Sequence, residues 1–198
     1  VIISDRDKIH AIKESYPFLT QDEGEYIGTG FAFAYQLLDF DGFCLHSSAV
    51  ALENRAVLFS GPCGSGKSTH ASLWQQYFGP HRAVIINDDK PALRRRDNGF
   101  YVYGTPWSGK EDLHANIKVP LGAVVFVQQA RENKIWRMDI RQALKMLLYQ
   151  SLRPNHSMIG MDRLLTLIGD LLKSTNIYKL DCNISPEAVE LVYNTIYR

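Results

Sequence analysis

Residues 56–78 constrain this chain more than any other segment. An apolar, β-prone run, Ala56–Ser60, leads straight into Gly61-Pro-Cys-Gly-Ser-Gly-Lys-Ser68, and a helix is expected over Ser68–Phe78. The middle segment fits the pattern G-x-x-x-x-G-K-[ST], whose glycines let the backbone wrap closely around phosphate oxygens. A strand before the loop and a helix after it are the context that this mechanism needs, because N–H groups at the helix start then point at the phosphates. The segment predicts a P-loop, and a plain glycine turn between strand and helix is the alternative.

The predicted loop gives roles to its side chains. Lys67 can reach the β- and γ-phosphates of a nucleoside triphosphate, and the Ser68 hydroxyl can ligate Mg²⁺. ATP or GTP with Mg²⁺ is therefore the expected ligand. Cys63 occupies a free position of the pattern, where it could make activity sensitive to thiol reagents. The residues expected to surround the nucleotide are Gly61, Gly64, Ser65, Gly66, Lys67, Ser68 and Thr69.

The rest of the chain mixes short buried strands with helices, which favours an α/β fold with a mixed sheet flanked by helices. Strands are expected at Phe43–Leu52, Ala83–Ile86, Phe100–Tyr103, Val119–Gln128 and Ile177–Cys182, with Ile135–Ile140 as a further candidate. Helices are expected at Phe31–Leu38, Arg141–Leu152, Asp162–Ser174 and Pro186–Tyr197. The strand pair around the short connection Glu53-Asn54-Arg55 indicates some antiparallel pairing. We expect one domain over residues 1–198, with residues 1–26 as a candidate N-terminal appendage.

Composition excludes several classes of function. Lys and Arg total 22 against 21 acidic residues, so the whole chain gives no electrostatic case for nucleic acid or an anionic membrane. No apolar run is long enough for a membrane span. The three cysteines are far apart and form no C-x-x-C pair, which argues against a zinc ribbon or a disulfide scaffold. A reducing compartment, and hence a cytoplasmic location, is the expectation.

Asn87-Asp88-Asp89 follows the expected strand Ala83–Ile86. Adjacent carboxylates at a strand end can divide two tasks, holding Mg²⁺ and accepting a proton from an attacking hydroxyl. The alternative is a turn or a helix N-cap, because Asp and Asn favour both. Strand ends of a parallel-type sheet converge on the ligand crevice. With a P-loop in the same sheet, we therefore favour the functional interpretation.

At these residues the chain resembles the catalytic domain of HPr kinase/phosphorylases and their small relatives, which share the P-loop fold of phosphoenolpyruvate carboxykinases. The matching stretches are Leu45-His46-Ser-Ser-Ala-Val50, Gly61–Thr69 and Ile86-Asn-Asp88-Asp89. The resemblance covers roughly residues 43–89. The family's N-terminal domain and its later glycine-rich signature have no recognisable counterpart, which weakens the carrier protein HPr as the acceptor.

The resemblance implies a set of catalytic roles. His46 would lie near the transferring phosphate or the metal, and Asp88 would be the general base toward a substrate hydroxyl. Lys67 would hold phosphate, while Ser68, Asp89 and Asp88 would serve the metal. It implies oligomers as well, although the short architecture would suit a monomer equally.

The leading hypothesis is an enzyme, an ATP/Mg-dependent kinase that phosphorylates a hydroxyl, preferentially serine, of a protein, peptide or small molecule. A second hypothesis is a nucleotide-binding switch or regulatory ATPase without a dedicated acceptor. A third is a small-molecule kinase with a lid of basic residues, for which Arg94–Arg96 and Arg131–Arg141 are the weak candidates.

Other residues carry competing interpretations. His46 on an apolar strand would, without the resemblance, be a core histidine. The loop Gly104–Lys110 could contact phosphate or acceptor through Ser108 and Lys110, or Trp107 could pack over the sheet edge. Arg94–Arg96 is expected to be solvated surface, with docking of an acidic partner as the alternative. His70 is expected on a helix surface.

Overall fold

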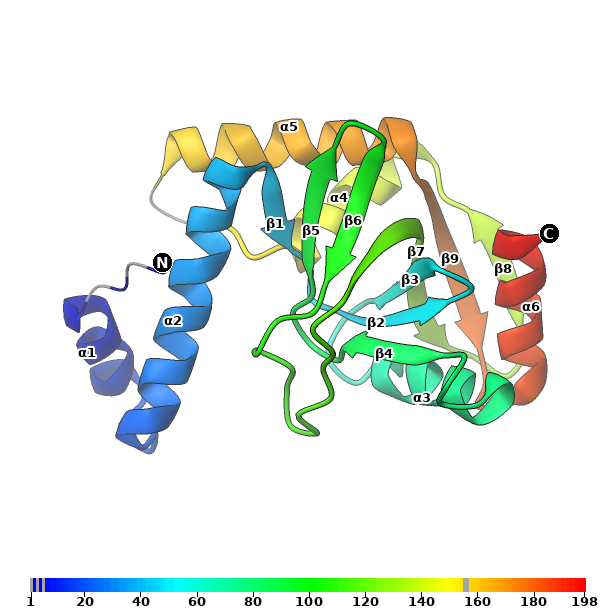
Figure 1. Cartoon of the computed structure of the whole chain (residues 1–198), viewed down its shortest axis with the longest axis horizontal. Helices are drawn as coiled ribbons and strands as arrows, with labels where there is room; N and C mark the ends of the chain where they lie inside the picture. The colour runs from blue at the N-terminus through cyan, green and yellow to red at the C-terminus, as the bar shows by residue number, and fades with distance from the viewer. Residues whose placement is uncertain (1, 3, 5, 155–156) are drawn as a thin grey trace.

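The computed structural model describes residues 2, 4, 6–154 and 157–198, so positions 1, 3 and 5 of the segment 1–26 lie outside it. The described residues form a curled mixed sheet of nine strands with helices packed around it (Figure 1). In chain order the elements are α1 (Arg6–Ser15), α2 (Gln21–Leu37), the short 3-10 helix η1 (Leu38–Phe40), β1 (Gly42–Cys44), β2 (Ser47–Leu52), β3 (Arg55–Ser60), α3 (Lys67–Phe78), β4 (Val84–Asn87), β5 (Ala92–Arg96), β6 (Gly99–Tyr103), β7 (Lys118–Gln129), β8 (Lys134–Arg137), α4 (Ile140–Gln150), α5 (Met158–Ser174), β9 (Asn176–Cys182) and α6 (Pro186–Tyr197).

The sheet topology brings several strand ends to one edge. The strand order is β1-β5-β6-β7-β3-β2-β4, and β9 pairs with both β7 and β8. Strands β3, β7 and β9 run parallel, while β2 is antiparallel to both β3 and β4. Because Ser47 of β2 pairs with Ser60 of β3, and Ala49 pairs with Asn87 of β4, the first residues of β2 lie between the carboxyl ends of β3 and β4. The residues that follow Ser60 and Asn87 therefore emerge at the same edge.

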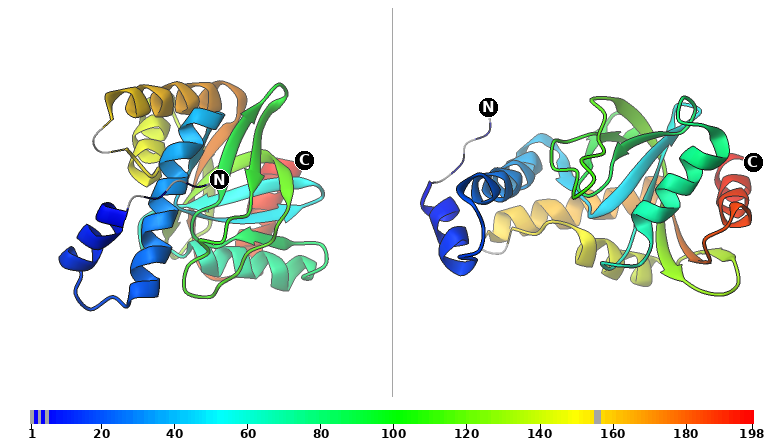
Figure 2. Two further views of the ribbon diagram at one scale, coloured as in Figure 1. Left: turned by 60° about the vertical axis from the view of Figure 1, so that its left-hand side comes forward. Right: turned by 90° about the horizontal axis from the view of Figure 1, so that it is seen from below.

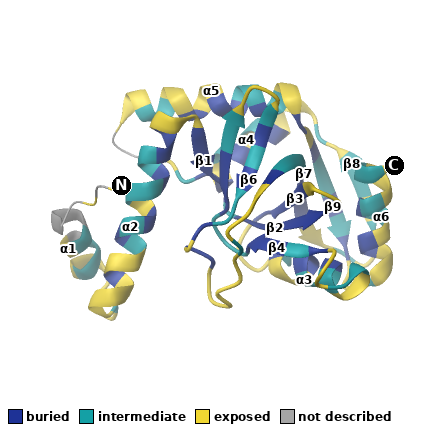
Figure 3. Ribbon diagram, viewed as in Figure 1, coloured by how far each residue is buried: buried dark blue, intermediate teal, exposed yellow. Residues whose placement is uncertain are grey.

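The central strands are buried on both faces, which explains why their sequences read as continuous apolar runs. Side chains of a strand alternate between the two faces of a sheet. In β7, Val124 and Phe126 contribute to one buried cluster, whereas Val125 and Val127 contribute to the other. The dark-blue strands at the centre of Figure 3 show this double burial.

Each face is covered by its own pair of helices. Leu147 of α4 and Leu164 of α5 belong to the first cluster, and Trp74 of α3 and Val189 of α6 belong to the second. In Figure 1, α5 lies across the top of the sheet, whereas α3 lies along its lower side and α6 at the C-terminal end. Helix α3, which begins directly after the glycine-rich segment, is thus held by the core through Trp74.

Helices α1 and α2 lie side by side at the other end of the molecule (Figure 2). Helix α2 begins with a capping box, in which the Thr20 hydroxyl accepts from the N–H of Glu23 and the Glu23 carboxylate accepts from the N–H of Thr20. Residue 26 therefore lies inside α2 and not at a boundary between elements. The helix meets the rest of the molecule at Gly30, where an added Cβ would lie 2.8 Å from the Trp107 ring.

The expected strands and helices are confirmed with three corrections. The predicted strand Phe43–Leu52 divides into β1 and β2, because the chain bends at His46 and the two parts pair with different strands. The run Arg94–Arg96, for which only solvated surface was expected, forms the end of a strand, β5, that was not predicted. Helix α2 starts at Gln21, ten residues before the predicted apolar segment, because its cap and first turns are polar.

Among the described residues, every helix is too short or too polar to cross a membrane.

Candidate functional site

The glycine loop, which we define as residues 61–66, connects β3 to α3. Three of its glycines have positive φ: 148° at Gly61, 77° at Gly64 and 97° at Gly66. These angles suit glycine, because a Cβ makes this region of backbone space costly for other residues. At Gly61 a Cβ would also approach the Ser65 hydroxyl oxygen to 2.7 Å. Gln129 at the end of β7 fixes the loop to the sheet, since its Nε2 donates to the Gly64 carbonyl at 2.9 Å.

Lys67 is the first residue of α3 and is only 7% exposed. Its ammonium donates to the carbonyls of Gly61 at 3.1 Å and Pro62 at 3.0 Å. Burial lowers the pKa of Lys67, while the negative charges of Asp88 and Asp89 act in the opposite direction. The ammonium therefore lies over the glycine loop, within electrostatic range of the paired aspartates.

Ser48 of β2 connects the two predicted halves of the site. It is fully buried, and its Oγ donates to Asp88 Oδ1 at 2.6 Å and lies 3.4 Å from the Oγ of Ser68. A hydroxyl has a single proton, which the short bond commits to Asp88, so the Ser68 hydroxyl is left to donate to the Ser48 oxygen. The start of α3 and the end of β4 are thus joined through one buried hydroxyl.

His46 lies on the other side of the aspartates. Its Nε2 is 3.4 Å from Asp89 Oδ1, and its Nδ1 is 3.1 Å from the Oε1 of Gln150, the last residue of α4. Burial lowers the pKa of His46, the positive charge of Lys67 lowers it further, and Asp89 opposes both. His46 therefore sits in the bend between β1 and β2, in contact with a predicted metal ligand.

Asn87 fixes the turn that presents the two aspartates. Its side-chain oxygen accepts from the N–H groups of Asp89 at 2.9 Å and Lys90 at 2.7 Å. Its Nδ2 donates to the Thr105 carbonyl at 2.8 Å. The Lys90 ammonium forms an ion pair with Asp89. Asn87 thus stabilises a turn, as the alternative interpretation of this segment predicted, and Asp88 and Asp89 lie at the candidate site.

The loop Gly104–Lys110 packs beside this turn. Trp107 is 7% exposed, stacks on Phe33 at a centroid distance of 4.9 Å and donates through Nε1 to the Tyr26 carbonyl. Ser108 is buried, and its hydroxyl donates to Asp112 at 2.8 Å. Trp107 and Ser108 therefore hold the loop in place, and Lys110 is exposed.

The structure places Arg95 in a surface ion-pair network, and it moves His70 from the expected helix surface into the core. Arg95 on β5 forms ion pairs with Asp41 and Asp170, so part of the predicted basic surface is already neutralised within the chain. His70 is 2% exposed, not on the helix surface, and its ring packs edge-on against Phe59 at 4.5 Å. Burial lowers the pKa of His70 to about 4. The helix face that carries Trp74 toward the sheet also carries His70.

Metal-ligating side chains are sparse. Within residues 2, 4, 6–154 and 157–198, no three side chains of His, Cys, Asp or Glu gather closely enough to hold an ion by themselves.

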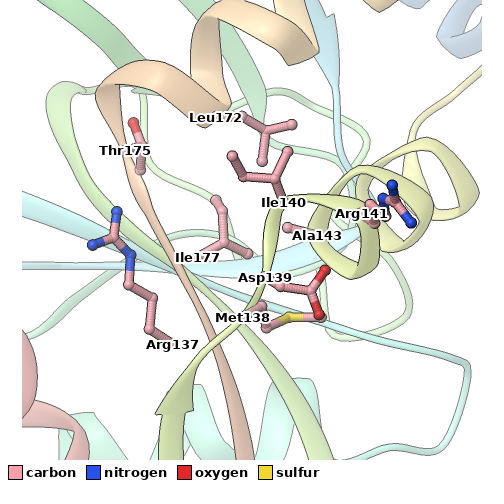
Figure 4. Close-up of a pocket in the computed structure, with 9 residues that line it drawn as sticks. All are labelled: Arg137, Met138, Asp139, Ile140, Arg141, Ala143, Leu172, Thr175 and Ile177. Atoms are coloured by element: carbon pink, nitrogen blue, oxygen red, sulfur yellow. The ribbon is translucent and has the colours of Figure 1, made fainter.

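A further pocket lies elsewhere. It has a volume of about 600 Å³ and is bounded by the β8–α4 connection, the end of α5 and the start of β9, with Arg137, Arg141 and Ile177 among the side chains that line it (Figure 4). Its lining includes Arg141 of the weak lid candidate Arg131–Arg141, but none of the residues expected to hold the nucleotide, the metal or the transferring phosphate. It lies near the amino end of β9, whereas the glycine loop follows the carboxyl end of β3, which runs in the same direction.

Sequence reasoning missed Ser48, Gln129 and Gln150 as contributors to this site. Ser48 stands within the stretch that carried the resemblance, and its position two residues after His46 was the available signal. Gln129 and Gln150 are separated from the loop and from His46 by 65 and 104 residues respectively. No sequence pattern connects them.

Comparisons with known proteins give a limited result. No family model matches the chain, and no curated protein sequence matches it. The Hpr(Ser) kinase/phosphatase from Coxiella burnetii is a solved structure to which the chain is similar, with a TM-score of 0.40 and 11% identity over 77% of this chain and 94% of that chain. The similarity is a distant one in fold.

Proposed function

We propose that this chain binds a nucleoside triphosphate with Mg²⁺ at the glycine loop and transfers its terminal phosphoryl group to a hydroxyl acceptor. One observation carries the proposal. The buried Ser48 hydroxyl bonds to Asp88 at 2.6 Å and lies 3.4 Å from Ser68. A residue suited to proton acceptance and a residue suited to metal ligation are therefore adjacent at the start of a helix that follows a glycine loop.

The loop residues fit a polyphosphate. The start of α3 presents N–H groups and the positive end of the helix dipole, which favour anions. The Ser65 hydroxyl oxygen is buried and has no hydrogen-bond partner among the residues that the structure describes, so it is a polar group that a ligand could satisfy. Lys67 is held by carbonyls of the loop itself. Phosphate oxygens are stronger partners for an ammonium than neutral carbonyls, because they carry a negative charge that attracts it.

The metal fit rests on oxygen donors. Ser68, which is exposed, and Asp89, with Asp88 beside it, would hold Mg²⁺ together with phosphate oxygens and water. When bound, the ion neutralises charge on the phosphates. His46, in contact with Asp89, would keep that carboxylate oriented.

Asp88 supplies the proton-accepting step. Ser48 engages Oδ1, which leaves Oδ2 to accept the proton of the acceptor hydroxyl as its oxygen attacks the terminal phosphorus. The bond from that phosphorus to the bridging oxygen breaks, and the nucleoside diphosphate leaves with the electron pair. Lys67 stabilises negative charge on the transferring group. Positioning and charge neutralisation are most of what phosphoryl transfer requires.

The test measures binding and transfer separately. Calorimetry with ATP and with GTP, each with Mg²⁺, should register binding that Lys67→Ala abolishes and that the exposed-surface control Lys145→Ala retains. No heat from either nucleotide would end the proposal.

Transfer is followed with γ-labelled ATP and a pool of serine peptides and small alcohols. Asp88→Asn should lower labelled product at least about 100-fold, the usual size of a lost general base. The matched carboxylate control Asp97→Asn, in an exposed turn, should keep wild-type transfer. Full transfer by Asp88→Asn would refute the general-base role. Label released only as inorganic phosphate would favour the switch hypothesis.

A further inference from the structure

A small apolar cleft opens between α2 and the segments that carry Lys90, Trp107 and Leu152. It has a volume of about 110 Å³ and is lined by Ile27, Gly30 and Phe31 of α2, by Trp107 and Leu152, and by Lys90. Liquid water occupies about 30 Å³ per molecule, so the cleft has the room of three or four waters. This size suits one branched aliphatic group. Apart from Lys90, the lining residues named here are uncharged.

Lys90 relates this cleft to the candidate site. Its side chain lines the cleft while its ammonium pairs with Asp89, which contacts His46. Lysines commonly place their aliphatic stems along apolar surface while the charge reaches a polar partner. The Lys90 stem is therefore part of the cleft wall, and its charged end leads directly to Asp89.

The loop that carries Trp107 also connects the cleft to Asp89. An added Cβ at Gly109, two residues later, would lie 3.2 Å from the Cβ of Asp89. Trp107 is fixed by stacking on Phe33 and by its bond to the Tyr26 carbonyl. Trp107 is thus fastened to α2, and the loop that carries it packs against Asp89.

The α2 side of the cleft exposes apolar surface. Phe31, which lines the cleft, is 40% exposed, and Tyr26 beside it is 45% exposed. Exposed aromatic side chains next to a cleft are typical of a surface that binds something, because aromatic residues are enriched where partners bury surface. The cleft therefore joins the candidate catalytic edge to an exposed aromatic strip on α2.

We infer that this cleft binds an apolar group of the hydroxyl acceptor, carried next to the hydroxyl that receives the phosphoryl group. The inference rests on the proposed function and specifies its acceptor class: a hydroxyl adjacent to an aliphatic group about the size of a leucine side chain. The group occupies the cleft beside Phe31 and the Lys90 stem, and the hydroxyl extends along Lys90 toward the paired aspartates. The acceptor is either a residue of a peptide or a free alcohol of the same chemistry.

Two pairs of probe acceptors distinguish a peptide acceptor from a free alcohol. The first is a serine hexapeptide with leucine on both sides of the serine, paired with the same peptide carrying asparagine in those places. The second is isoamyl alcohol, paired with ethylene glycol. Binding is followed by the fluorescence of Trp107, with Trp107→Phe as the blank. Transfer is followed by ADP formation from Mg-ATP above the acceptor-free rate.

The apolar member of at least one pair should be about tenfold better in both measurements, since one well-placed aliphatic group in a pocket is worth 10-fold or more. Preference in the peptide pair identifies a peptide acceptor, and preference in the alcohol pair alone identifies a free one. Phe31→Ala should reduce the preference to about twofold, while Phe31→Leu should keep it. Phe18→Ala is the control, because Phe18 is 80% exposed and packs on Tyr16 outside the cleft.

A failure of the acceptor assignment can be distinguished from a failure of the proposed function. If Mg-ATP binds but neither pair favours its apolar member, the acceptor assignment is wrong and the proposed function stands. If Phe31→Ala unfolds at the wild-type temperature and keeps the tenfold preference, the cleft is not the subsite. If no nucleotide binds, the proposed function fails and the acceptor assignment falls with it.

Discussion

Replacing Ser48 with alanine tests the contact on which the proposed mechanism depends. The change removes the buried Oγ that donates to Asp88 Oδ1 at 2.6 Å, and with it the weaker contact at 3.4 Å with the Ser68 hydroxyl. A hydrogen bond to a charged group is worth about 1.5–3 kcal/mol. With a factor of ten for each 1.36 kcal/mol, the loss corresponds to roughly a 10- to 150-fold lower rate if the bond acts fully in the transition state. We expect kcat/KM for acceptor phosphorylation to fall within that range.

The neighbouring serine provides a matched control. Ser47 is also fully buried on β2, and its hydroxyl donates to the Leu45 carbonyl at 3.0 Å and not to a carboxylate. Ser47→Ala and Ser48→Ala therefore lose one hydroxyl each from adjacent positions. Their melting temperatures should be compared by circular dichroism, and their rates by ADP formation with Mg-ATP and an acceptor. If the two variants turned over within twofold of each other, Ser48 would have no special part in positioning Asp88.

Two further predictions concern buried and exposed titratable groups. Burial raises the pKa of Cys44 to about 12 and that of Cys182 to about 11, whereas Cys63 is exposed on the glycine loop. Iodoacetamide should therefore label Cys63 alone in the native protein at pH 7.5, as detected by peptide mass spectrometry, and Mg-ATP should slow that labelling. Rapid labelling of either buried thiol would contradict the packing. His70 has a folded pKa of about 4 against an ordinary 6.5, so the unfolded chain takes up its proton first and stability falls as the pH drops from about 6.5 to about 4. That pKa difference corresponds to roughly 3 kcal/mol. Urea unfolding measured at pH 7 and at pH 5 gives the loss in the free energy of unfolding, and this loss should be about 2 kcal/mol smaller for His70→Leu than for the wild type or the exposed-histidine control His81→Gln. Equal losses would show that burial does not hold His70 neutral.

The sequence by itself determined the order and kind of most elements. Runs such as Ala56–Ser60 and Val119–Gln128 predict buried strands, and β3 and β7 lie at those places with side chains packed on both faces. Burial on two faces removes the need for polar residues, so the pattern is visible locally. Strand β5 was not predicted, because its three consecutive arginines conceal the alternation of apolar and polar residues that marks a strand. Their charges pair with distant aspartates or reach solvent.

The candidate site was only half visible in the sequence. The glycine pattern and the paired aspartates could be found because their chemistry lies in adjacent residues. Ser48 and Gln150 could not be assigned in the same way, since their partners Asp88 and His46 are 40 and 104 residues away in the chain. Only the antiparallel pairing of β2 with both β3 and β4 places Ser48 between the loop and the aspartates.

His46 and His70 show the same difference between what the sequence indicates and what the tertiary structure decides. The resemblance predicted that His46 lies near the transferring phosphate or the metal, with a core position on its apolar strand as the alternative, and His70 was expected on a helix surface. The bend between β1 and β2 turns His46 toward Asp89, and the packing of α3 against Phe59 turns His70 into the core. Local sequence decides which groups a segment carries. Which groups meet depends on strand pairing and helix packing, because these set the distances between segments that the chain keeps far apart.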